Sequence, residues 1–190
     1  MAKVKTRDKL LDVAYKEIYK YGFQGASVDN ILRDAKVTKG SMYHHFKSKK
    51  ELALAVIDER LAPKMASMFT ITETDLSLQK KLFSLIDFIG SIPYLLKSGC
   101  PLNKLINEMS PLDDDFKVHL SLIHHTLHYN LQKMIEEGIE KKQIQAHDSA
   151  HLATFIIATV WGNISLGEGV VTPESYQKAM QHLKFYINAL

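Results

Sequence analysis

Apolar residues recur along most of the chain at spacings of three and four residues, which place them on one face of a helix. Leu10, Ala14 and Ile18 show this spacing near the N-terminus, and no segment alternates convincingly in the manner of a strand. The pattern predicts nine helices, over residues 6–21, 27–35, 39–45, 48–69, 78–96, 101–109, 111–140, 148–166 and 173–190. We therefore expect an all-α fold.

Residues that favour helix ends lie between these segments. Side chains suited to N-capping stand at Thr6, Ser27, Thr38, Ser48, Asp148 and Thr172. Glu51, three residues after Ser48, predicts a capping box. Gly22 is expected to end the first helix, and Pro63 and Pro93 to kink the two helices that contain them. The polar stretch 70–77 is expected to be a loop.

The composition indicates a protein of the reducing interior of the cell. Hydrophobic residues make up 46% of the 190 residues, yet no apolar run reaches the roughly 18 residues that a membrane-spanning helix needs. The first residues are basic but lack the apolar region of a secretory signal. Cys100 is the single cysteine, which excludes an internal disulfide. We expect a cytoplasmic protein with no membrane partner.

The net charge of +3 conceals an uneven distribution. Residues 1–50 hold twelve Lys or Arg against five Asp or Glu, whereas residues 51–190 hold twelve against sixteen. We expect a basic domain over 1–47 and a mildly acidic one over 48–190, joined by the helix at 48–69. This asymmetry is typical of a head that binds a polyanion, and a solvated basic face without a partner is the alternative.

Two short helices joined by a tight turn, at 27–35 and 39–45, follow a longer helix in the basic domain. This order is that of a helix-turn-helix, whose second helix lies in the DNA major groove. In that helix Met42 and Phe46 are four residues apart and predict a buried stripe. Ser41, Tyr43 and His44 project elsewhere, and so many polar donors are unusual for a helix of a protein core.

The sequence SVDNI at 27–31, followed by AKVTKGSMYHHFKSKKEL at 35–52, resembles the signature of the TetR family of repressors. The resemblance implies a nine-helix, two-domain fold with a helix-turn-helix head on a body that dimerises and binds an effector. It implies a repressor that a small molecule releases from a palindromic operator. Lys36 stands where most members have glycine, so we expect a positive φ there.

The resemblance also assigns DNA-binding residues, which are Ser27, Asn30, Lys36, Thr38, Lys39, Gly40, Ser41, Tyr43, His44 and Lys49. We expect Lys39 to donate to guanine and Gly40 to let the backbone approach a base. Tyr43 can donate to phosphate. Ser27 and Thr38 stand at helix starts, where backbone N–H groups suit a phosphate oxygen, although both also serve as caps without DNA.

The helix at 148–166 is apolar nearly all round, so it must be covered on every side. With the helix at 173–190, the resemblance implies a four-helix bundle between two copies of the chain. The expected interface residues are Phe155, Ala158, Gly162, Tyr176, Met180, Leu183 and Ile187. The alternative is that these residues form the core of a single chain.

Met and aromatic residues are frequent in the body, and methionine suits adaptable apolar pockets. The expectation of an effector pocket rests mainly on the family, and ordinary core packing is the alternative. The candidate lining residues are Met65, Phe69, Phe83, Tyr94, Cys100, Met109, His124, His128 and Trp161.

Cys100 offers a second mode of regulation. The segment GCPLNKLINE at 99–108 partly resembles the GC-x-x-x-N-x-x-x-E stretch of a TetR branch, some members of which sense electrophiles or oxidants. Lys104 stands where that pattern has asparagine. A thiol near a helix N-terminus is expected to have a lowered pKa. A redox-sensing repressor is therefore an alternative, while a lone buried cysteine is the simpler interpretation.

Other chemistry finds little support in the sequence. His124 and His128, four residues apart, can ligate one metal, but no cysteine or carboxylate stands at a matching spacing, so we expect no metal or cofactor. The sequence holds no phosphate loop, nucleophile elbow or HExxH motif, so we do not expect an enzyme. The alternative from another class is a helical ligand-binding protein or enzyme that does not bind DNA.

Overall fold

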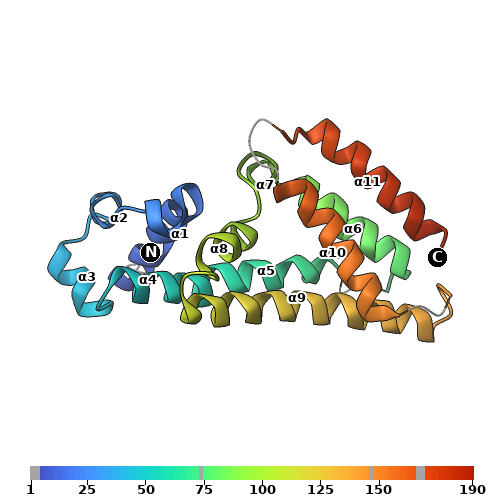
Figure 1. Cartoon of the computed structure of the whole chain (residues 1–190), viewed down its shortest axis with the longest axis horizontal. Coiled ribbons are helices and arrows are strands. Elements are labelled where there is room, and N and C mark those ends of the chain that lie inside the picture. The colour runs from blue at the N-terminus through green and yellow to red at the C-terminus, as the bar shows by residue number, and fades with distance from the viewer. Residues whose placement is uncertain (1–4, 73–74, 146–147, 166–169) are drawn as a thin grey trace. The chain divides into compact units, whose positions relative to one another are not determined.

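The computed structural model describes residues 5–72, 75–145, 148–165 and 170–190, and within these ranges every regular element is a helix (Figure 1). This confirms the predicted all-α fold. The chain forms two compact units, one of Met1–Lys64 and Lys104–Leu122, the other of Met65–Asn103 and Ile123–Leu190. No helix formed by the described residues is long and apolar enough to cross a membrane.

The first unit begins with α1 (Thr6–Gly25), α2 (Val28–Ala35), α3 (Lys39–His45) and α4 (Lys49–Val56). Lys5, not Thr6, precedes the first turn of α1, so the predicted cap at Thr6 is wrong: Thr6 is itself helical, and no side chain caps this end. Gly22 interrupts α1 with a φ of 75°, which confirms that the regular helix ends there.

Three short helices of this unit have the predicted caps. The hydroxyls of Ser27, Thr38 and Ser48 each accept a hydrogen bond from the backbone N–H three residues on. The capping box at α4 is shifted, because the Glu51 carboxylate accepts from the N–H of Lys47 at 2.8 Å. Backbone donors at both sides of this helix start are thus satisfied.

The long helix predicted after Ser48 is continuous but changes its winding. After α4 come a π-helical turn η1 (Ile57–Leu61), α5 (Ala62–Ser67) and a 3₁₀ turn η2 (Met68–Thr72). Pro63 has no N–H to complete a regular helix, and the wider π turn directly before it accommodates this. The predicted loop at 70–77 starts too early, since η2 extends to residue 72.

The remaining helices are α6 (Leu78–Gly90), α7 (Pro93–Ser98), α8 (Pro101–Met109), α9 (Asp114–Glu140), α10 (Ser149–Ser165) and α11 (Pro173–Asn188). Pro93 starts a separate helix instead of kinking one. α9 begins later than expected, because the Asp113 carboxylate accepts the N–H groups of Asp115 and Phe116. The predicted helix end at residue 166 and the connector at 167–169 lie outside the described residues.

In the second unit α6, α10 and α11 lie side by side (Figure 1). Tyr176 of α11 is buried, and its hydroxyl donates to the carbonyl of Ile86 at 3.1 Å. A Cβ at Gly90 would lie 2.6 Å from the Tyr176 ring, so glycine is required for this close packing of α6 against α11.

Candidate DNA interface and effector cavity

The second helix of the helix-turn-helix, α3, has one buried and one exposed side. Met42 and Phe46 are buried, which confirms the predicted stripe. Lys39, Tyr43 and His44 are exposed, and Tyr43 is 45% exposed despite its large apolar ring. The outer side of α3 therefore offers an ammonium, a phenol and an imidazole on a firmly packed support.

The turn before α3 has the predicted strained backbone. Lys36 follows α2 with φ 55° and ψ 47°, the left-handed conformation that glycine adopts more readily. Its N–H donates to the carbonyl of Arg33, and its side chain is exposed. Gly40, on the first turn of α3, has open space around the position of a Cβ.

The predicted DNA-binding residues differ in exposure. Lys36, Thr38, Lys39, Gly40, Tyr43 and His44 are exposed, whereas Ser27, Asn30, Ser41 and Lys49 are half-buried. The Asn30 amide donates to Glu17 at 3.0 Å and accepts from Arg33 at 2.9 Å. The structure thus engages Asn30 inside the head, and its contact with DNA stays a prediction.

Lys49 also has contacts inside the first unit. Its ammonium donates to the carbonyl of Gln24 at 3.2 Å and lies 4.8 Å from the centre of the Phe23 ring. Burial lowers the pKa of Lys49. The Lys49 side chain thus holds the segment after Gly22 against the start of α4. A DNA phosphate at this position would either compete for the ammonium or bind the backbone N–H of Lys49.

Sequence reasoning did not assign a function to Glu108 of α8, which holds the same segment from another side. Its carboxylate accepts from the N–H of Phe23 at 2.9 Å and of Gln24 at 2.7 Å. Gly22 is needed for this contact, because a Cβ there would lie 2.6 Å from the carboxylate. The only signal was the glutamate at the end of the partial GC-x-x-x-N-x-x-x-E pattern.

Ion pairs fasten α1 to the helix that follows the head. Arg60 donates to Asp12 at 2.6 Å and to Asp8 at 3.0 Å. Arg7 donates to Glu59 at 2.6 Å and lowers the pKa of that carboxyl. Because these pairs are largely exposed, we expect each to contribute little to stability on its own.

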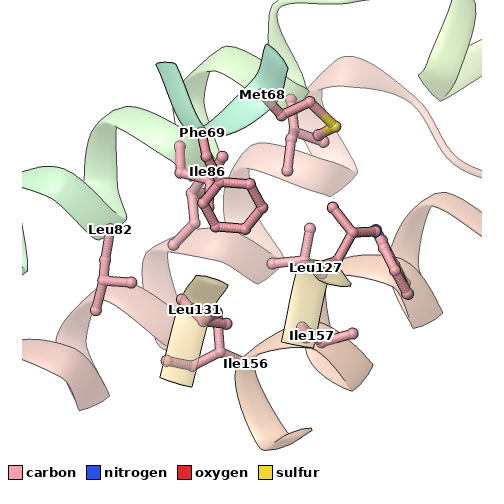
Figure 2. Close-up of a pocket in the computed structure, with 12 residues that line it drawn as sticks. Met68, Phe69, Leu82, Ile86, Leu127, Leu131, Ile156 and Ile157 are labelled. Carbon is pink, nitrogen blue, oxygen red and sulfur yellow. The ribbon is translucent and has the colours of Figure 1, made fainter. Parts of the chain in front are cut away.

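The second unit contains an apolar cavity of about 40 Å³ that is partly open to solvent. Figure 2 shows Phe69, Ile86 and Leu127 around the same space. Its lining residues are Met68, Phe69, Leu82, Leu85, Ile86, Ile89, Leu127, Leu131, Ile156, Ile157, Val160 and Trp161. Of the predicted pocket residues, Phe69 and Trp161 are among them.

A second cavity, of about 260 Å³, carries the polar groups. It is lined by Asn103, His124, His128, Thr154, Ile157, Ala158, Trp161, Gly162 and Ser165. The structure thus brings His124, His128 and Trp161 together, and the rings of His124 and Trp161 have their centres 5.6 Å apart. Burial lowers the pKa of His124, and the neighbouring imidazoles of His125 and His128 lower it further.

Five predicted pocket residues line neither cavity. Met65 and Met109 are buried in packing elsewhere, Tyr94 is exposed on α7, and Phe83 lies beneath the Lys184 ammonium. Cys100 is only 2% exposed, and burial raises the pKa of its thiol despite the nearby N–H groups of α8. The expected lowering of that pKa is therefore wrong, and redox sensing through Cys100 stays an alternative that its burial does not favour.

The predicted dimer residues separate into two groups. Tyr176, Met180, Leu183 and Ile187 of α11 are buried within this chain. Phe155, Ala158 and Gly162 of α10 are exposed, and nothing lies within 4 Å of a Cβ at Gly162. The exposed face also includes Tyr186, whose ring meets that of Phe155 at 5.2 Å, and Phe185, which is 78% exposed. Sequence reasoning had not assigned these last two to the interface.

No group of three or more His, Cys, Asp or Glu among the described residues is arranged to hold a metal ion. The chemistry in view is thus a hydrogen-bonding outer surface on α3 and two adjoining cavities in the second unit. An exposed helix-turn-helix and a separate helical unit are the parts of a DNA-binding transcriptional regulator.

Comparison with known proteins agrees with this class. Residues 10–56 match "Bacterial regulatory proteins, tetR family", and residues 82–183 match "Tetracyclin repressor-like, C-terminal domain". An uncharacterised HTH-type regulator from the lacX 3′ region of Lactococcus lactis subsp. lactis is 33% identical, over 85% of this chain and 82% of its own. The repressor DhaR of Mycobacterium sp. strain GP1 is 29% identical, over 86% and 83%.

A solved TetR regulator from Chloroflexus aurantiacus has the same fold, with a TM-score of 0.86 and 24% identity over 96% of this chain and 93% of that one. The chain belongs to the TetR family of bacterial transcriptional regulators. It is accordingly a DNA-binding regulator with a helix-turn-helix, in a family of regulators rather than enzymes.

Proposed function

We propose that the protein is a homodimeric repressor that binds a palindromic operator and leaves it when a small molecule occupies the second unit. The observation that carries the DNA-binding part is α3, whose exposed side bears Lys39, Tyr43 and His44 over the buried Met42 and Phe46. A helix presented in this way suits the major groove. Lys39 then donates to guanine, and Tyr43 donates to a phosphate.

Dimerisation follows from the size of the DNA site. One head reaches a single half-site, and specific binding by helix-turn-helix proteins uses two heads about 34–36 Å apart. The exposed face of Phe155, Ala158, Gly162, Phe185 and Tyr186 supports pairing through α10 and α11. The small residues permit close approach of a second helix, and the aromatic rings supply apolar area to bury.

Release by an effector is supported by the two cavities in the second unit. A ligand shifts the equilibrium only as far as it prefers the form of the protein that does not bind DNA. The cavities are separate from the surface of α3, so the effector and the operator do not compete for the same residues.

The test starts with the purified full chain and a library of random duplexes. We expect selection to enrich an inverted repeat and sedimentation to show two chains per duplex. In fluorescence anisotropy with the enriched duplex, Tyr43→Ala is expected to weaken binding more than a hundredfold. One hydrogen bond to a charged phosphate contributes about 1.5–3 kcal/mol, and the dimer loses two.

Two controls make this result specific. Tyr43→Phe removes only the hydroxyl and separates hydrogen bonding from ring contacts. Because the Tyr43 side chain is exposed, circular dichroism and dimer mass are expected to be unchanged in both variants. Enrichment of no sequence, or binding of a single chain to a single half-site, would contradict the proposal.

A further inference from the structure

The apolar and the polar cavity of the second unit adjoin each other. Ile157 and Trp161 of α10 line both of them. One molecule can therefore place an apolar part in the inner cavity of about 40 Å³ and its remaining part in the outer cavity of about 260 Å³. Ala158 and Gly162 of the outer lining also lie on the exposed face proposed for dimerisation, so in the dimer the partner chain borders this cavity. The small inner volume suits a short alkyl chain or the edge of a ring.

Among the residues that the structure describes, no Lys, Arg, Asp or Glu side chain lines either cavity. An ionised ligand would lose part of its hydration there without gaining a counter-charge from these residues. In the outer cavity, the imidazole of His124 packs against the ring of Trp161. Burial, together with the neighbouring imidazoles of His125 and His128, lowers the pKa of His124 and so favours its neutral imidazole.

The polar groups of the outer cavity differ in how far they are already engaged. The Nε2 of His128 lies 3.1 Å from the carbonyl of Ala150 and 3.0 Å from the hydroxyl of Thr154, so Nε2 is the protonated nitrogen. The Asn103 amide donates to Ser165 at 2.7 Å. Among the described residues, His124 has ring contacts but no hydrogen-bond partner.

A neutral imidazole has one donor and one acceptor nitrogen. An uncharged ligand can hydrogen-bond to this imidazole through a hydroxyl or a carbonyl group. We propose that the effector is an uncharged amphipathic small molecule, with a hydrocarbon part in the inner cavity and a hydroxyl or carbonyl group hydrogen-bonded to His124. This inference rests on the proposed function of the second unit as an effector-binding domain.

Trp161 makes the proposal measurable, because it is the single tryptophan of the chain and lines both cavities. The experiment titrates the full chain at pH 7.5 with four six-carbon probes: hexan-1-ol, hexan-2-one, hexanoate and hexylammonium. We expect saturable changes in tryptophan fluorescence with the alcohol and the ketone, at concentrations at least tenfold lower than with either ion. No saturable response to the neutral probes, or equal or tighter binding of an ion, would overturn the proposal.

Two variants of neighbouring histidines locate the hydrogen bond. His124→Phe keeps an aromatic ring but removes both nitrogens, and we expect it to weaken hexan-1-ol binding about fivefold, as for the loss of one net hydrogen bond. His125→Phe is the matched control at the neighbouring position: His125 is exposed and lines neither of these cavities, although it borders a further hollow of about 440 Å³ with His124 and His128. Equal effects of the two substitutions would contradict the placement of the polar group.

The same probes distinguish this inference from the proposed function. If the alcohol binds at Trp161 but leaves the affinity for the enriched duplex unchanged, the ligand chemistry stands and the release step fails. If hexanoate alone lowers the DNA affinity, the release step stands and the inferred chemistry fails.

Discussion

In the proposed function, the head and the second unit recognise their partners in opposite ways. In the head, Lys39, Tyr43 and His44 face solvent, and the buried residues of α3 only support them. In the second unit, the proposed ligand site consists of one apolar cavity and one that also carries polar side chains such as His124 and Asn103. DNA binding by the head therefore depends on charge and hydrogen bonds and weakens with salt, whereas ligand binding depends on buried apolar area and is nearly independent of salt.

The difference has a consequence for stability as well. A residue on the outer side of α3 can change without disturbing the packing beneath it. A residue around the cavities belongs to the core of its unit, so its substitution alters stability together with ligand binding. Substitutions that separate folding from function are accordingly expected in the head.

Gly40→Ala gives the sharpest separation. The fold has open space for the new Cβ, and alanine in place of a helical glycine stabilises by about 0.5–1 kcal/mol. If the backbone of α3 approaches a base at Gly40, the same Cβ overpacks this contact, which costs about 1–3 kcal/mol, or about 5-fold to 150-fold in affinity. Urea unfolding and anisotropy with the enriched duplex measure the two effects. A variant with undiminished DNA affinity would show that the backbone of α3 does not approach the groove at Gly40.

Glu108→Gln tests the support of the head. The amide keeps one acceptor for the N–H groups of Phe23 and Gln24, so we expect a loss of about 1–2 kcal/mol of stability. Amide hydrogen exchange at these two residues is expected to accelerate. Glu140→Gln, at an exposed position of α9, is the matched control. Unchanged exchange at Phe23 and Gln24 would contradict the contribution of this carboxylate.

The two regions also differ in how much of them the sequence predicts. Ser27 and Thr38 cap backbone N–H groups three residues on, so their caps were predictable from local spacing. The positive φ at Lys36 was expected from the family resemblance, because most members have glycine there. The cavities combine residues of η2, α6, α9 and α10, which are distant in sequence, and only Phe69 and Trp161 of the inner lining were anticipated.

Periodicity has a related limit in α11. The spacing of Tyr176, Met180 and Leu183 predicts a buried face but not which surface covers it. In the structure this face is buried within the chain, and Phe185 and Tyr186 lie on the exposed one. For Cys100, position near a helix start was visible in the sequence, while the burial that decides its pKa was not.

A pH series separates the regions by their titrating groups. The folded-state pKa of His124 is lowered, so the unfolded chain binds a proton more readily near pH 6.5 and stability falls as the pH decreases below that value. The lowered pKa of the Glu59 carboxyl acts in the same direction, but only below about pH 4.5, its ordinary pKa. We expect the Tm of His124→Phe minus that of the wild type to rise from pH 7.5 to pH 5.5. A constant difference would show that His124 titrates alike in both states.

Lys36→Gly is expected to have the smallest effects, with a gain in stability and a loss of DNA affinity. Glycine relieves the left-handed strain at φ 55°, which costs a non-glycine residue about 1–2 kcal/mol, but it also gains freedom in the unfolded chain, so we expect a net stabilisation below about 1 kcal/mol. If Lys36 contacts a phosphate, the dimer loses two such contacts, and the slope of log affinity against log salt decreases by about two. Lys36→Gln keeps a polar side chain, one atom shorter, and the strained backbone while removing the charge. Loss of a phosphate contact reduces counterion release whether or not the backbone strain is relieved. A salt slope that is unchanged in both variants would therefore show that Lys36 does not contact a phosphate.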